Sequence, residues 1–227
     1  MLVLLDIDGT LLHGSPLAHT HAMARGMSAV YGLPVVYEDI VAINPSGRTD
    51  QEIVRVVLRA RGLSDDEITA GLAEWIPLAC AIYRDIEDHH PHGTVAPGAH
   101  AALDRLREAG ASLALLTGNL EDIGHAKMEL AGLGEFFTRG EGAFGSDHES
   151  RDALVPIARA RSRGDEDGPT VVVGDTPADI RCARAGDARC VAVTSGPYGP
   201  DELAQADAVA ADIAAAALVL RGWLGGA

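Results

Sequence analysis

Three apolar runs in this chain each end in residues whose side chains could carry chemistry. The clusters are Asp6-Ile-Asp8-Gly9-Thr10, Thr117-Gly118-Asn119 and Gly174-Asp175-Thr176-Pro177-Ala178-Asp179. In an open parallel sheet, ligands bind at the carboxyl ends of the strands, so we expect the three clusters to meet. Carboxylates gathered in this way are costly unless a cation neutralises them. Ligand sets made only of oxygen favour Mg²⁺ over zinc or copper.

Alternating strand and helix patterns surround these clusters. The patterns predict strands at 2–7, 112–116, 170–173 and 190–193, and helices at 97–109, 120–131, 151–161 and 177–185. This alternation is typical of a doubly wound parallel sheet, which is a Rossmann-like α/β core. The block 14–91 instead shows helix patterns and almost no strand pattern. We therefore predict an α/β core of residues 1–13 and 92–227, with an all-helical insert of residues 14–91 after the first strand.

Composition narrows the class of partner and the compartment. The 227 residues carry a formal net charge of −15, which repels nucleic acid and anionic membranes. The N-terminus lacks the pattern of a signal peptide, and the sequence has no apolar run of membrane-spanning length. The three cysteines show no CxxC spacing, which favours a reducing compartment. We expect a cytoplasmic protein that binds neither nucleic acid nor membrane; these patterns make no prediction about oligomeric state.

The three clusters resemble the motifs of the haloacid dehalogenase superfamily of phosphohydrolases. The sequence Asp6-x-Asp8-Gly-Thr matches the first motif, Leu-Thr117-Gly-Asn the hydroxyl motif and Gly-Asp175-Thr-Pro-x-Asp179 the acidic motif. The insert 14–91 resembles the helical cap domain of the phosphoglycolate phosphatase and β-phosphoglucomutase branch. The dehalogenases themselves lack an acid two residues after the nucleophile, so Asp8 indicates phosphoryl transfer rather than dehalogenation.

The resemblance implies a Mg²⁺-dependent phosphatase that acts on a small phosphorylated metabolite. Asp6 would attack phosphorus and form an aspartyl phosphate. Asp8 would protonate the leaving group and then activate the water that hydrolyses the intermediate. We expect neighbouring carboxylates to raise the pKa of Asp8, as acid catalysis at neutral pH requires.

The resemblance also implies a metal site and a phosphate site. Mg²⁺ would be held by Asp6, by the backbone carbonyl of Asp8 and by Asp175, directly or through water to Asp179. The phosphoryl oxygens would be bound by three residues at the start of a helix. These residues are Thr117, Gly118 and Asn119.

The family places a lysine beside the phosphate, usually before a proline upstream of the acidic motif. The corresponding stretch here reads Glu149-Ser-Arg151-Asp, without Lys-Pro. Lys127 is the only lysine in the chain and follows Thr117-Gly-Asn on the next predicted helix. Seven residues of helix separate it from Leu120, about 10 Å at ~1.5 Å per residue. We predict that Lys127 supplies the phosphate-side charge, with Arg151 as the alternative.

Arg48 is the candidate for substrate recognition by the cap. The segment Ser46-Gly-Arg48-Thr-Asp50 resembles the Gly-Arg-Thr segment that capped relatives carry over the active site. A guanidinium offers a fixed fork of donors to the non-reacting end of a substrate. The alternative is that Arg48 pairs with Asp50 or Glu52 on the surface.

Two other functions remain open from the sequence. A phosphomutase of the β-phosphoglucomutase type would use the same aspartyl-phosphate chemistry. A non-enzymatic binding or regulatory protein could also use this fold, although it would need neither Asp6 nor Asp8. His13 and His19 flank the first hinge of the insert; we interpret His13 as a linker residue, with a place at the border of the site as the alternative. The remaining cluster, which we interpret as a polar hinge with a zinc site as the alternative, comprises His89, His90 and His92.

Overall fold

The computed structural model describes residues 1–14, 17–86, 93–162 and 168–224. Within these residues, five parallel strands form one sheet in the order β4-β1-β5-β6-β7. The strands are β1 (Leu2–Leu5), β4 (Ser112–Leu115), β5 (Thr170–Gly174), β6 (Arg189–Val193) and β7 (Ala208–Ala210). The predicted doubly wound α/β core is therefore confirmed.

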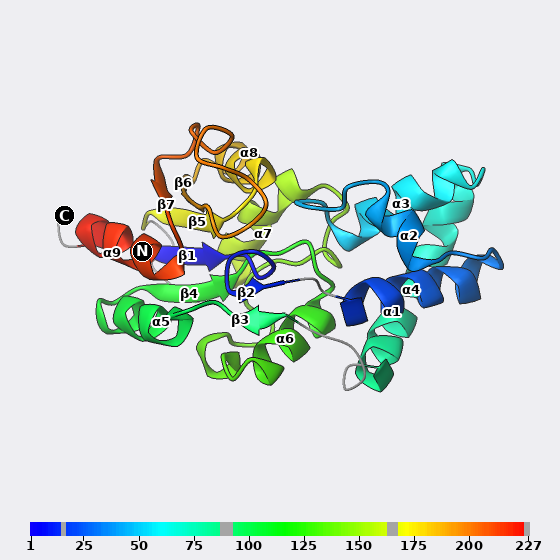
Figure 1. The fold of residues 1–227 in the computed structure, drawn as a ribbon, viewed down its shortest axis with the longest axis horizontal. Helices are drawn as coiled ribbons and strands as arrows, with labels where there is room; N and C mark the ends of the chain where they lie inside the picture. Colours follow the sequence, from blue (N-terminus) through cyan, green and yellow to red (C-terminus); the bar gives the residue numbers. More distant parts are fainter. Residues whose placement is uncertain (15–16, 87–92, 163–167, 225–227) are drawn as a thin grey trace.

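Helices cover both faces of this sheet because its central strands are apolar throughout. Successive side chains of a strand point to opposite faces. Val3 and Leu5 thus join one apolar cluster, and Leu2 and Leu4 join another. The first cluster includes side chains of α5 (Ala99–Glu108), α6 (Glu121–Leu130) and α9 (Ile213–Leu224). The second includes side chains of α7 (Leu154–Arg161) and α8 (Pro177–Ala185), which lie on the other side of the sheet (Figure 1).

Residues 17–86 form four helices with an apolar cluster of their own, and we call them the helical unit. These are α1 (Leu17–Tyr31), α2 (Tyr37–Val41), α3 (Asp50–Ala60) and α4 (Asp65–Ile86). Trp75 and Tyr83 of α4 are fully buried in this cluster. Gly26 lets α1 approach α4 closely, since a Cβ there would lie 3.0 Å from the Trp75 ring nitrogen. The unit lies at the right of Figure 1, at the far end from both termini.

The structure contains several elements that the sequence patterns did not predict, most of them short. β2 (Leu12–His13) pairs antiparallel with β3 (Thr94–Val95) and brings the two ends of the insert together. The predicted helix at 151–161 begins as a 3₁₀ turn, Arg151–Ala153, and a second 3₁₀ turn spans Gly134–Phe136. β7 and α9 were also absent from the prediction. The expected boundary at 91–92 and the residues His89, His90 and His92 lie outside the described residues.

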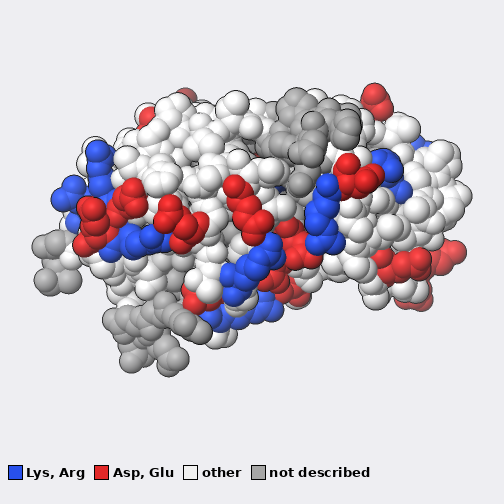
Figure 2. All heavy atoms as spheres, turned by 90° about the horizontal axis from the view of Figure 1, so that it is seen from below, with Lys and Arg blue, Asp and Glu red and all other residues white. Residues whose placement is uncertain are grey.

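The surface mixes acidic and basic side chains. Figure 2 shows both kinds next to one another across one face of the molecule. Arg139, for example, forms ion pairs with Asp122 and Glu129 at 3.2 and 3.1 Å. Among the described helices, none combines the length and the apolar character that crossing a membrane requires.

Candidate active site

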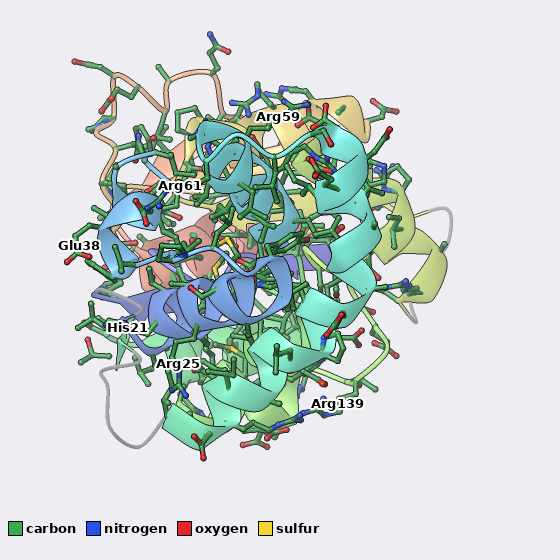
Figure 3. The ribbon with its side chains drawn as sticks, turned by 90° about the vertical axis from the view of Figure 1, so that its right-hand side faces the viewer. His21, Arg25, Glu38, Arg59, Arg61 and Arg139 are labelled. Atoms are coloured by element: carbon green, nitrogen blue, oxygen red, sulfur yellow. The ribbon has the colours of Figure 1, made fainter. Side chains whose placement is uncertain are left out.

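The carboxyl ends of the strands and the helical unit enclose one cavity of about 370 Å³. Asp6 follows β1, Thr117 lies two residues after β4, and Asp175 follows β5. All three line this cavity, so the predicted convergence of the three clusters is observed. The opposite wall comes from α1, α2, α3 and the segment 45–48. Seen from the end that carries the helical unit, α1–α4 lie in front of the sheet (Figure 3).

Three buried carboxylates lie together at the core side of this cavity, and two of them, Asp6 and Asp175, line it. One oxygen from each of Asp6, Asp175 and Asp179 lies within 4.8 Å of the others. Burial raises the pKa of Asp6, and Asp179 raises it further. Burial also raises the pKa of Asp175, as does repulsion from Asp6. Gly9 and Gly196 approach the Asp175 carboxylate so closely that a Cβ on either would overlap it.

Arg151 is the cation closest to these carboxylates. Its Nη2 lies 3.2 Å from Asp6 Oδ1 and also forms an ion pair with Asp179. Burial would lower the pKa of Arg151, but Asp179 and Asp6 raise it, so the group stays charged. One guanidinium against three carboxylates leaves a formal charge of −2. An all-oxygen donor set with this residual charge fits a hard divalent cation.

Asp8 has different partners from the other three acids. Lys127 Nζ lies 2.9 and 2.6 Å from its two oxygens, and Asn119 Nδ2 donates to Oδ2 at 2.9 Å. Burial by itself would raise the pKa of Asp8, but the charge of Lys127, together with the hydrogen bonds from Lys127 and Asn119, outweighs it and the pKa is lowered. The expectation of a raised pKa is therefore wrong for this arrangement, because a cation at contact distance dominates over the neighbouring carboxylates.

Lys127 and Arg151 both contact acids of the site, but each contacts a different carboxylate: Lys127 that of Asp8, and Arg151 that of Asp6. Lys127 extends from α6 with no side-chain exposure and donates to Asp8 and to Asn119 Oδ1, the latter at 2.6 Å. Arg151 holds Asp6. The two candidates for the phosphate-side charge thus lie on two sides of the site.

The loop 117–119 is held by hydrogen bonds between its own residues and by contacts with the helical unit. Thr117 is buried, and its Oγ1 accepts hydrogen bonds from Asn119 Nδ2 at 2.8 Å and from Asn119 N at 3.3 Å. Gly118 packs against the backbone of Arg48, whose carbonyl a Cβ at position 118 would overlap. The Gly118 carbonyl accepts from Asp50 N at 2.8 Å. The three predicted phosphate-binding residues line the cavity together.

Arg48 lies just before α3 and lines the same cavity, but it is paired with a residue of that helix. Its guanidinium forms an ion pair with Glu52, and the Arg48 side chain is 35% exposed. Gly47, at φ +78°, packs against Ala178 and Thr176 at the start of α8, where a side chain would not fit. The segment that carries Arg48 therefore contacts two of the three strand-end clusters.

Sequence reasoning missed three residues of this site, His19, Ser195 and Gly196. His19 lies buried in α1, and its Nε2 is 2.9 Å from Asp50 Oδ2. It shares the spacing of the buried residues Ala18, Ala22 and Met23, which could have revealed it. Ser195 and Gly196 follow β6, and Ser195 Oγ donates to the Gly9 carbonyl at 2.7 Å. Their position after a fourth parallel strand was the available signal.

Comparison with known proteins gives consistent matches. The model of the family described as haloacid dehalogenase-like hydrolase matches residues 3–184. "Probable phosphatase IndB" of Dickeya dadantii (strain 3937) is 27% identical over 206 residues, which cover 91% of this chain and 86% of that protein. The phosphoglycolate phosphatase of Pseudomonas putida is 28% identical over 196 residues, which cover 86% of this chain and 70% of that protein.

A solved structure shows the same fold. CbbY from Rhodobacter sphaeroides, in complex with phosphate, is 17% identical and superposes with a TM-score of 0.65 over 94% of each chain. The family match spans most of this chain and includes all three strand-end clusters. The chain therefore belongs to the haloacid dehalogenase-like hydrolase family.

Proposed function

We propose that this chain is a Mg²⁺-dependent phosphatase that hydrolyses a small phosphorylated metabolite through an aspartyl phosphate on Asp6. The observation that carries the proposal is the buried group of Asp6, Asp175 and Asp179, of which Asp6 and Asp175 follow strands and line the cavity. The phosphatases among its relatives support the reaction class. A cavity of about 370 Å³ lies at the small end of ligand pockets, which suits a metabolite.

Asp6 would be the nucleophile because its carboxylate is buried, faces the cavity and is held by Arg151. Its attack forms a bond to phosphorus while the bond to the leaving oxygen breaks. Asp8 would deliver a proton to that oxygen and take one from water in the second step. A phosphate dianion bound beside Asp8 would raise the pKa of Asp8 and let it carry the first proton.

Asp6, Asp175 and Asp179, with the backbone carbonyl of Asp8, would hold the Mg²⁺, which when bound offsets the charge of these carboxylates and of the phosphoryl group. Thr117, Gly118 and Asn119 would bind phosphoryl oxygens.

Two cations would share the phosphate side. Lys127 would act behind Asp8 and Asn119, and Arg151 would act beside Asp6, in line with their partners in the structure. Fixed positive charge on both sides would stabilise the charge that develops on the transferring group.

We propose that residues 14–91 form a cap that excludes water from the reaction. Arg48 would leave Glu52 and bind the non-reacting end of the substrate. A carboxylate at that end would suit a guanidinium, so phosphoglycolate, the substrate in the names of several relatives, is the first compound to test. We place the protein in the cytoplasm, and three free, buried cysteines support this.

Phosphate release from a panel of monoesters that includes phosphoglycolate tests the proposal. We expect release with MgCl₂, none with EDTA, and none from Asp6→Asn, whose amide is nearly isosteric but a poor nucleophile. Consumption of a sugar phosphate without phosphate release would indicate a mutase instead. No turnover of any compound with Mg²⁺ present would refute the assignment.

A further inference from the structure

A buried chain of hydrogen bonds joins the helical unit to the core, apart from the three carboxylates that we propose hold the cation. His19 and Asp50 belong to the helical unit, whereas Lys127 and Asp8 belong to the core. His19 Nε2 lies 2.9 Å from Asp50 Oδ2, and His19 Nδ1 lies 3.3 Å from Lys127 Nζ. The side chains of His19, Asp50 and Lys127 are 7%, 3% and 0% exposed. The chain ends on the two oxygens of Asp8.

The partners fix where the protons of this chain lie. An ammonium group can only donate, so the Nδ1 atom that faces Lys127 must accept. The ring proton therefore lies on Nε2 and is donated to Asp50. The three ammonium protons then go to Asp8, Asn119 and His19. Lys127 cannot turn away from any of these acceptors without losing a charge-assisted hydrogen bond.

Asp50 also holds the two core segments that carry the predicted chemistry. Its Oδ2 accepts from Leu120 N at 2.8 Å, at the start of the helix that bears Lys127. Its own N–H donates to the Gly118 carbonyl at 2.8 Å. One residue of the helical unit thus fixes both the loop 117–119 and the first turn of α6.

We propose that His19 and Asp50 are positioning residues for Asp8. They hold Lys127, and Lys127 holds the Asp8 carboxyl group in the orientation from which it protonates the leaving oxygen. This inference rests on the proposed phosphatase function. In the step concerned, the Asp6–phosphorus bond forms and the bond to the leaving oxygen breaks. The electron pair of the broken bond stays on that oxygen, which takes the Asp8 proton. Because the positioning pair belongs to the helical unit, its docking on the core is coupled to proton transfer.

Two substitutions at one position separate this role from simple packing. In His19→Asn, an amide oxygen can occupy the position of Nδ1 and accept from Lys127. In His19→Gln, the amide instead reaches the position of Nε2, so the contact with Asp50 is kept and the acceptor for Lys127 is lost. The substrates are 4-nitrophenyl phosphate, whose leaving group needs little protonation, and an alkyl phosphate that the wild type hydrolyses.

We expect His19→Gln to lower kcat/KM for the alkyl phosphate by about 10²-fold, the usual size of a general-acid contribution. The same variant should change kcat/KM for 4-nitrophenyl phosphate by less than about threefold, since little acid catalysis is lost there. His19→Asn should recover about tenfold of the loss on the alkyl phosphate, because it restores the acceptor.

Gln51→Ala is the matched control. Gln51 is buried, follows Asp50 directly and joins the helical unit to the core through the Gly145 carbonyl at 2.8 Å. Gln51→Ala should change kcat/KM by the same factor for both substrates. Three outcomes would each overturn the positioning role. The first is an equal loss of kcat/KM on both substrates in His19→Gln, and the second is no recovery in His19→Asn. The third is a Gln51→Ala variant that loses more on the alkyl phosphate than on 4-nitrophenyl phosphate. A wild type that hydrolyses neither substrate with Mg²⁺ would refute the proposed function and this inference with it.

Discussion

Replacing Lys127 with methionine removes a cation that has no contact with solvent. The side-chain exposed fractions are 0% for Lys127 and 30% for Asp8. Methionine fills a similar volume but leaves Asp8 without its counter-charge and Asn119 Oδ1 without its donor. Removing one partner of a buried ion pair costs about 3–5 kcal/mol, because the other charge stays buried. Asp8 keeps some contact with the cavity, which places the expected loss at about 3 kcal/mol, the lower end of that range.

Urea unfolding followed by circular dichroism measures this loss. The experiment is run in EDTA, because a cation bound to the folded state would add its own stabilisation. Arg139→Met is the matched control, since Arg139 also pairs with carboxylates, those of Asp122 and Glu129, but its side chain is 54% exposed. Exposed pairs contribute little, so this control should lose less than about 1 kcal/mol.

A second substitution tests the cause of the loss. Asp8→Asn in the Lys127→Met background replaces the buried charge with a neutral amide. The double variant should regain about 1–3 kcal/mol, the usual coupling between residues in contact. Equal losses in Lys127→Met and Arg139→Met, or no gain in the double variant, would show that the Lys127–Asp8 pair does not act as a buried ion pair.

Three further predictions concern other parts of the molecule. Arg48→Ala should raise KM for phosphoglycolate and leave KM for 4-nitrophenyl phosphate unchanged. The control is Arg59→Ala, whose partner Asp65 lies on the outer surface, and it should change neither KM value. Equal effects of Arg48→Ala on both substrates would exclude the proposed role of Arg48. His125 is buried, and its pKa is lowered first by burial and then by Arg139. Its neutral form therefore stabilises the fold above the unfolded pKa of about 6.5, and this stability is lost as pH falls below that value. The midpoints of urea unfolding at pH 7.5 and 5.5 should therefore differ more in the wild type than in His125→Leu. Mg²⁺ at 100 times its Kd should stabilise the wild type by about 2.7 kcal/mol. Asp175→Asn should remove most of this gain in a thermal unfolding assay. An equal gain in both proteins would place the cation elsewhere.

Much of the core could be predicted from the sequence because its signals are local. The run Thr170–Gly174 is apolar and β-branched, so it forms a strand buried on both faces. Thr176 and Asp179 then form the capping box that starts α8. The short elements could not be predicted for a related reason. β2 and β3 have two residues each, too few to show a period, and β7 is an Ala-Val-Ala segment with weak strand preference.

The residue types of the site were also readable, since the carboxyl ends of parallel strands meet wherever the strands pair. Sequence alone therefore determined that Asp6, Asp175 and Thr117 would line one cavity.

Only the tertiary structure decided which charges face one another. Lys127 and Arg151 were alternatives for one role, yet each holds a different carboxylate. The contact from Lys127 to Asp8 spans 119 positions of the chain, and the contact to His19 spans 108. Such contacts depend on how the helical unit docks on the core. The pKa of Asp8 follows from them, because it is set by burial and by the distance to each neighbouring charge rather than by residue type.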